Sequence, residues 1–122
     1  RDVDLFRTIQ AQNHLAIHVS LISTSPKLIR WLEARSPMPH ARLRALQRLT
    51  TAGINAGLIT APILPGVNDS PRQPTALLTA AKRAGARFAH PSALRLYPAI
   101  RDRFNRSFPS GSRRRAARTR PP

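Results

Sequence analysis

The chain has 122 residues, 41% of them apolar, which is enough for one modest domain or for part of a larger one. Its formal net charge is +16, and the absence of cysteine excludes disulfides and cysteine-ligated metal centres within the chain. No apolar run approaches the roughly 18 residues of a membrane span, and no charged-then-apolar leader opens the sequence. We therefore expect a cytoplasmic protein without membrane contact.

A helix, a strand and a second helix are predicted first along the chain. Residues 2–12 carry apolar side chains at spacings of three and four, which is typical of an amphipathic helix. Residues 15–22 alternate with a period of two, so that His18 and Ser20 lie on the face opposite the apolar side chains of this strand. Ser25, followed by a proline, is a candidate N-cap for a short helix that runs to about residue 32.

The middle of the chain contains one pattern twice, a glycine that ends a helix and is followed by a strand. A helix over about residues 40–52 should end at Gly53, with a strand over 54–64. Residues 70–73 have the pattern of a capping box, and the helix that they open should end at Gly85. The two stops lie about 32 residues apart, the length of a βα unit.

A third strand is expected within residues 86–96, where Pro91 forces an edge position or a kink. A short helix follows at about 99–108. Five arginines lie in the last ten residues, and we expect residues 109–122 to form an Arg-rich disordered tail after a folded segment at 1–108. About three βα units predict an α/β fold with parallel strands, either as a small three-layer domain or as part of a barrel.

Ligands of α/β proteins bind at the loops that leave the carboxyl ends of parallel strands. Two such loops are predicted here. One lies at residues 23–25, and the other is stiffened by prolines, with Gly66 suited to a positive φ and with Asn68 and Asp69 as polar side chains at its tip. The inward-facing His18 and Ser20 suit a ligand-lined barrel, whereas a hydrogen-bonded core histidine is the alternative interpretation of His18. No metal site is expected.

Several runs of sequence, in this order, resemble radical S-adenosylmethionine proteins of the spore photoproduct lyase-like group. They are Val19-Ser20-Leu21-Ile22-Ser23-Thr24, Leu32-Glu33-Ala34-Arg35-Ser36-Pro37, Ala52-Gly53-Ile54, Ala61-Pro62-Ile63-Leu64-Pro65-Gly66-Val67-Asn68-Asp69 and Leu94-Arg95-Leu96. The resemblance implies the C-terminal portion of a partial (βα)6 TIM-like barrel. In that family, a CxxxCxxC loop binds a 4Fe–4S cluster, and the bound cofactor is cleaved reductively to a 5′-deoxyadenosyl radical.

The resemblance also implies a set of cofactor-binding residues. Two serines lie on and just after the fourth barrel strand, which approaches the cofactor. An arginine matches that of the family's Glu-Pro-Arg-like turn and would contact the cofactor carboxylate, while the loop after the fifth strand borders the adenine and ribose. The six positions are Ser20, Ser23, Arg35, Pro62, Gly66 and Asn68.

The chain departs from the family pattern, because the cluster cysteines are absent and Ala34 replaces the usual proline. We therefore expect a fragment of a radical S-adenosylmethionine enzyme that is inactive alone and that needs the missing N-terminal half of the barrel as its partner. Its substrate and catalytic residues are not assigned. Two alternatives are a basic nucleic-acid-binding α/β module, which would use the Arg-rich tail and helix arginines, and a decayed non-catalytic remnant. Outside the tail, the charge is expected to lie on ordinary solvated helix faces.

Overall fold

The computed structural model describes residues 1–107, so the predicted tail at 109–122 lies outside the described residues. Helices and strands alternate along most of the described chain. In order, the elements are α1 (Val3–Gln12), β1 (Ile17–Ser20), α2 (Pro26–Leu32), α3 (Pro39–Thr51), β2 (Ala56–Ile63), α4 (Arg72–Arg83), β3 (Ala89–Ala93) and α5 (Pro98–Ser107). No helix among them is long and apolar enough to cross a bilayer.

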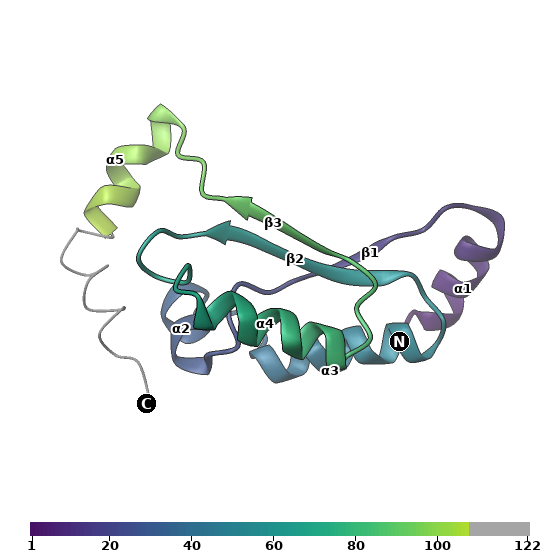
Figure 1. Ribbon diagram of the computed structural model, residues 1–122. Helices are drawn as coiled ribbons and strands as arrows, with labels where there is room; N and C mark the ends of the chain where they lie inside the picture. The colour runs from purple at the N-terminus through teal and green to yellow at the C-terminus, as the bar shows by residue number, and fades with distance from the viewer. Residues whose placement is uncertain (108–122) are drawn as a thin grey trace.

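The three strands form one parallel sheet in the order β1-β2-β3, which confirms the predicted α/β class. Ile17 pairs with Ala56 across β1 and β2, and Leu58 pairs with Ala89 across β2 and β3. Helices α2, α3 and α4 lie together on one side of this sheet (Figure 1). We call these three helices the helix layer.

The opposite side of the sheet carries no described helix, and we call it the open face. It presents His18 and Ser20 from β1, Ile59 from β2 and His90 from β3. The predicted alternation of β1 is confirmed, since His18 and Ser20 are exposed while their neighbours Ile17 and Val19 pack against the core. The fully buried large side chains of that core are Leu21, Ile29, Leu46, Ile54 and Leu58.

Strand β3 is an edge strand, as Pro91 predicts. Its register with β2 shifts between Thr60 and Ile63, next to a cis peptide bond between Ala61 and Pro62. The chain then continues into α5, which lies beyond the carboxyl end of β3 and apart from the helix layer (Figure 1).

The expected helix N-termini are correct in one case and wrong in the other. Ser25 caps α2, because its Oγ accepts a hydrogen bond from the Leu28 N–H at 3.3 Å. The capping box at residues 70–73 does not form. The Gln73 amide instead donates to the carbonyl of Val67 at 2.9 Å, so this side chain ties the preceding loop to α4 rather than returning to Ser70.

Both predicted helix stops are confirmed, since Gly53 and Gly85 each have φ of +81°. The two positions differ in their surroundings. A Cβ at Gly53 would meet no atom within 4 Å, whereas a Cβ at Gly85 would lie 2.6 Å from the Thr50 hydroxyl. That hydroxyl is held in place by a 2.7 Å hydrogen bond to the carbonyl of Ala84.

This difference makes a matched pair of substitutions. Gly53→Ala should lower the free energy of unfolding by about 1 kcal/mol, because alanine resists the left-handed region. Gly85→Ala should cost about 2 kcal/mol, because it adds the collision with Thr50 to the same backbone strain. Urea unfolding of both variants measures these losses. Equal losses in the free energy of unfolding would show that the Thr50 side chain moves aside without a cost in stability.

Candidate functional site

Asn68 joins the loops that leave the carboxyl ends of β1 and β2. Its side chain is 4% exposed, and its Oδ1 accepts a 2.6 Å hydrogen bond from the Leu64 N–H. Its Nδ2 donates to the carbonyls of Ile22 and Pro62, at 3.2 Å each. Every polar atom of the amide is therefore occupied, and the loop after β1 is fastened directly to the loop after β2.

The position of this amide corrects one expectation. The sequence predicts Asn68 at the loop tip, but the side chain turns inward, because three backbone groups of the two loops require partners. Asp69 alone of the pair remains exposed, and its Oδ1 accepts a 2.8 Å hydrogen bond from the N–H of Gly66. The predicted positive φ of Gly66 is confirmed at +75°.

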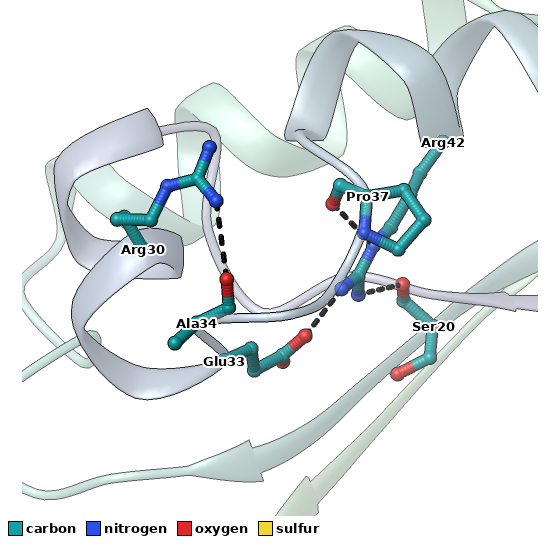
Figure 2. A network of polar contacts seen from close by, with 6 residues as sticks. All are labelled: Ser20, Arg30, Glu33, Ala34, Pro37 and Arg42. Carbon is teal, nitrogen blue, oxygen red and sulfur yellow. Dashed lines mark hydrogen bonds and ion pairs between the residues drawn. The ribbon is translucent and has the colours of Figure 1, made fainter.

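Arg42 forms a second polar junction at the same end of the sheet, shown in Figure 2. Its Nε donates to the Pro37 carbonyl at 3.0 Å, and its Nη1 donates to the Ser20 carbonyl at 2.7 Å. Its Nη2 forms a close ion pair with Glu33. Only 12% of the Arg42 side chain is exposed, so this guanidinium locks α3, the turn after α2 and the end of β1 together.

The junction at Arg42 is not predicted by the sequence patterns described above. The signal is nevertheless present, since Arg42 precedes the apolar residues Leu46 and Leu49 by four and seven positions and so falls on the buried side of α3. A charged residue on the apolar stripe of a helix requires a buried partner. Glu33 supplies it.

The two free edges of the sheet differ. The N–H groups of Ile17 and Leu21 donate to the carbonyls of Asn55 and Ile59, on the β2 side of the strand. Because backbone groups alternate in direction along a strand, those of His18 and Ser20 point to the free edge of β1. At this edge, Arg42 donates a hydrogen bond to the Ser20 carbonyl. The edge-facing backbone groups of β1 that precede this carbonyl remain available to a further strand. At the other edge, β3 carries Pro91, which has no N–H to offer a further strand.

Three aromatic rings meet on the open face, near the beginnings of the strands. The ring centroids lie 4.9 Å apart for His18 and Phe88, 5.6 Å for His18 and His90, and 5.4 Å for Phe88 and His90. The rings converge where β2 carries Gly57, and a Cβ there would come within 2.4 Å of the Phe88 ring. These rings fill the end of the open face that is remote from the Asn68 loops.

The predicted serines and arginine have different environments. Ser20 is exposed on the open face, so its hydroxyl is accessible there. Ser23 is buried, and its Oγ accepts a 3.0 Å hydrogen bond from the Ser25 N–H. Arg35 is exposed on the turn that Arg42 ties to β1, and no other described residue holds its guanidinium.

The six predicted cofactor positions thus divide into two groups. Ser20, Arg35 and Gly66 are exposed at this end of the sheet, whereas Ser23 and Asn68 use their side chains within the protein. Pro62 contributes its carbonyl to Asn68. The structure therefore brings Pro62 and Asn68 into contact. It also links Ser20 to the turn that carries Arg35, because Arg42 bonds to both segments.

The described residues offer few side chains that could ligate a metal. Among residues 1–107, no group of three or more His, Cys, Asp or Glu side chains is placed to hold a metal ion. An iron–sulfur cluster does not fit the residues present, because the chain offers no cysteine thiolate to ligate it. A carboxylate-bearing ligand fits better, since Arg35 offers an unengaged guanidinium at the carboxyl end of the sheet.

Relatives of the chain are found in bacteria and in a virus. Uncharacterized proteins of Mycobacterium bovis and Mycobacterium tuberculosis are each 34% identical over 86 residues, which cover 70% of this chain and 25% of each relative. An uncharacterized protein of Acidianus two-tailed virus is 34% identical over 65 residues, covering 53% of this chain and 21% of that protein.

The chain spans about a quarter of the length of the mycobacterial relatives that it matches. No protein-family model matches it, and no solved structure gives a significant match.

Proposed function

We propose that this chain is the C-terminal part of a radical S-adenosylmethionine protein of the spore photoproduct lyase-like group and supplies part of the cofactor pocket. The observation that carries the proposal is the junction of the two strand-end loops by Asn68. Loops at the carboxyl ends of parallel strands are the usual ligand sites of α/β folds. A site of this kind needs loops that hold their relative positions, and the buried amide provides that constraint.

Two of the three exposed candidate residues, Arg35 and Ser20, have side chains that would contact the cofactor in this pocket. Arg35 would pair with the carboxylate of the cofactor, and the Ser20 hydroxyl would approach the cofactor from the open face. The Arg42 junction supports both, because one guanidinium fixes the end of β1 and the turn that carries Arg35. Asn68 and Ser23 act as positioning residues, since their side chains are used inside the protein.

The same proposal makes the three-stranded sheet part of a (βα)6 barrel. Further strands would add at β1, where the edge offers free backbone groups up to Ser20, and not at β3, where Pro91 interrupts the edge. The missing N-terminal half of the barrel would therefore lie beside β1 and across the open face. The chain spans about a quarter of the mycobacterial relatives, so proteins of that length have room for the other half of a barrel.

The chemistry of the whole protein would come from the other half. A 4Fe–4S cluster would donate the electron that cleaves the cofactor, and its ligands are absent from this chain. We accordingly expect no catalytic activity from the 122 residues alone.

Binding of S-adenosylmethionine should require more of the barrel than this chain supplies. Calorimetry should detect no tight binding of S-adenosylmethionine by the isolated chain, and light scattering should detect its association, because the β1 edge and open face are uncovered. Joined to the polypeptide encoded immediately before Arg1, the chain should bind the cofactor. That polypeptide should contain CxxxCxxC within roughly 100 residues, the length of three βα units. Tight binding by the isolated monomer, or no such motif, would contradict the proposal.

A further inference from the structure

Helix α5 follows the last described strand, and none of its residues is buried. It lies beyond the carboxyl end of β3 and apart from the helix layer (Figure 1). In contrast, α3 and α4 each bury side chains beneath the helix layer. The further strands of the proposed barrel would add at β1, so that barrel requires no strand at the edge of the sheet from which α5 continues.

An apolar stripe runs along α5. Tyr97, just before the helix, is 68% exposed, Ile100 is 49% exposed, and Phe104 is half-buried. These side chains are spaced by three and four residues, so they lie on one side of the helix. Single exposed apolar side chains need no explanation, whereas a stripe of them at helical spacing indicates a contact surface.

The charges beside this stripe have one sign. A residue turns the helix by about 100°, which places Arg101 along one side of the stripe and Arg103 along the other. Both guanidinium groups are exposed and make no hydrogen bond or ion pair with another described residue. Asp102, the single carboxylate of α5, lies nearly opposite the stripe, so it does not balance the two arginines there.

We propose that α5 lies in the headgroup region of an anionic lipid membrane, with its apolar stripe toward the acyl chains and the flanking arginines on the lipid phosphates. Interfacial helices combine aliphatic and aromatic side chains on one side with arginines around them, and the arginines select an anionic surface. The expectation of no membrane contact is based on the lack of a spanning segment. A helix that lies parallel to the membrane surface needs none.

Two other occupants match the stripe less well. A second copy of the chain would bring the arginines beside one stripe against those beside the other, and like charges across an interface are costly. A protein groove binds a helix through side chains that fill deep pockets. Phe104 is already half-buried in this protein and has a contact of its own, so it cannot serve as such an anchor. Shallow insertion into lipid requires only the exposed part of the stripe.

The first test measures sedimentation of the full chain with phosphatidylcholine vesicles that contain or lack phosphatidylserine. Two site variants change α5, and two control variants change exposed residues of the same kinds on α1, α3 and α4, with circular dichroism to verify folding. The substitutions are Tyr97→Ser with Ile100→Ser and Arg101→Gln with Arg103→Gln for the site, and Leu5→Ser with Leu78→Ser and Arg44→Gln with Arg48→Gln for the controls.

A second test measures insertion. Because the chain contains no cysteine, one introduced cysteine carries an environment-sensitive nitrobenzoxadiazole label at a single position. Ser107→Cys places the label at the end of α5, on the side of Ile100. Thr79→Cys places it on α4, in the helix layer. A third protein labelled at the α5 position lacks residues 109–122 and so removes the last five arginines.

We expect each site variant to bind phosphatidylserine vesicles about tenfold more weakly, and each control to change binding by less than about twofold. The emission of the label on α5 should shift to the blue with these vesicles, with or without residues 109–122, whereas the label on α4 should not respond.

Three results would overturn the proposal. Absence of binding to phosphatidylserine vesicles would exclude a lipid partner and favour a protein groove. Equal losses in the two arginine variants, with no loss when Tyr97 and Ile100 are replaced, would show that only the total charge matters. A label on α5 that keeps its emission, or that shifts only when residues 109–122 are present, would show that α5 does not itself insert.

Discussion

Replacing Asn68 with alanine should lower the free energy of unfolding by about 2–4 kcal/mol, a large effect for one short polar side chain. The substitution leaves the Leu64 N–H and the carbonyls of Ile22 and Pro62 without the amide that satisfies them. Two of these three hydrogen bonds are fully buried, so water cannot replace the lost partner without opening the loops.

Urea unfolding measures this cost, and the adjacent Asp69→Ala is the matched control. Asp69 is exposed and makes a single bond to Gly66, so its replacement should cost less than about 1 kcal/mol. Asn68→Asp should also destabilise the protein, because a carboxylate accepts from Leu64 but cannot donate to the two carbonyls. Similar midpoints for the Asn68→Ala and Asp69→Ala variants would contradict the assigned role of Asn68.

Arg42→Gln should lower the free energy of unfolding by about 2–3 kcal/mol. The guanidinium is mostly buried and serves Pro37, Ser20 and Glu33 at once, a geometry that glutamine cannot reproduce. Its removal leaves the partly buried carboxylate of Glu33 without a counter-charge, which is the costly way to break such a pair. The value lies below the range for fully buried pairs because Glu33 retains some contact with water.

A double-mutant cycle with Glu33→Gln isolates the ion pair from the two carbonyl contacts. The double variant should be more stable than the sum of the single losses implies, since no unpaired carboxylate remains. Arg44→Gln, on the exposed side of the same helix, should change stability by less than about 0.5 kcal/mol. If Arg42→Gln changed the free energy of unfolding as little as Arg44→Gln, the contacts of Arg42 in Figure 2 would not contribute to stability.

Local patterns in the sequence predict most of the fold. The period of two in β1 correctly assigns His18 and Ser20 to the open face, because alternation along a strand is a local property. Gly53 and Gly85 correctly mark the ends of α3 and α4, since each occupies a left-handed position that favours glycine. Pro91 correctly marks an edge strand. These features depend on a few adjacent residues.

Features of the site that join distant segments are less predictable. Asn68 bonds to a carbonyl 46 positions earlier, and Arg42 bonds to one 22 positions earlier. No local period reports such partners, so Asn68 is assigned to the loop tip and Arg42 receives no role. Gln73 fails as a capping residue for a related reason, because the carbonyl of Val67 in the loop accepts its amide.

The charge distribution also depends on topology. Along the sequence, the cations of α2, α3 and α4 look like ordinary solvated positions separated by strands. The parallel connections place all three helices on one side of the sheet, as Figure 1 shows, and so gather these cations on one surface. The count of charges follows from composition, whereas their common surface follows from the fold.

We propose that Asn68 and Arg42 together hold one side of a pocket for S-adenosylmethionine. The decisive experiment is calorimetric titration of the cofactor into the chain joined to its preceding polypeptide, with Arg35→Ala and Arg44→Gln variants in parallel. We expect binding that Arg35→Ala weakens about tenfold, by loss of the carboxylate contact, and that Arg44→Gln leaves unchanged. Absence of binding, or equal binding by all three proteins, would contradict it.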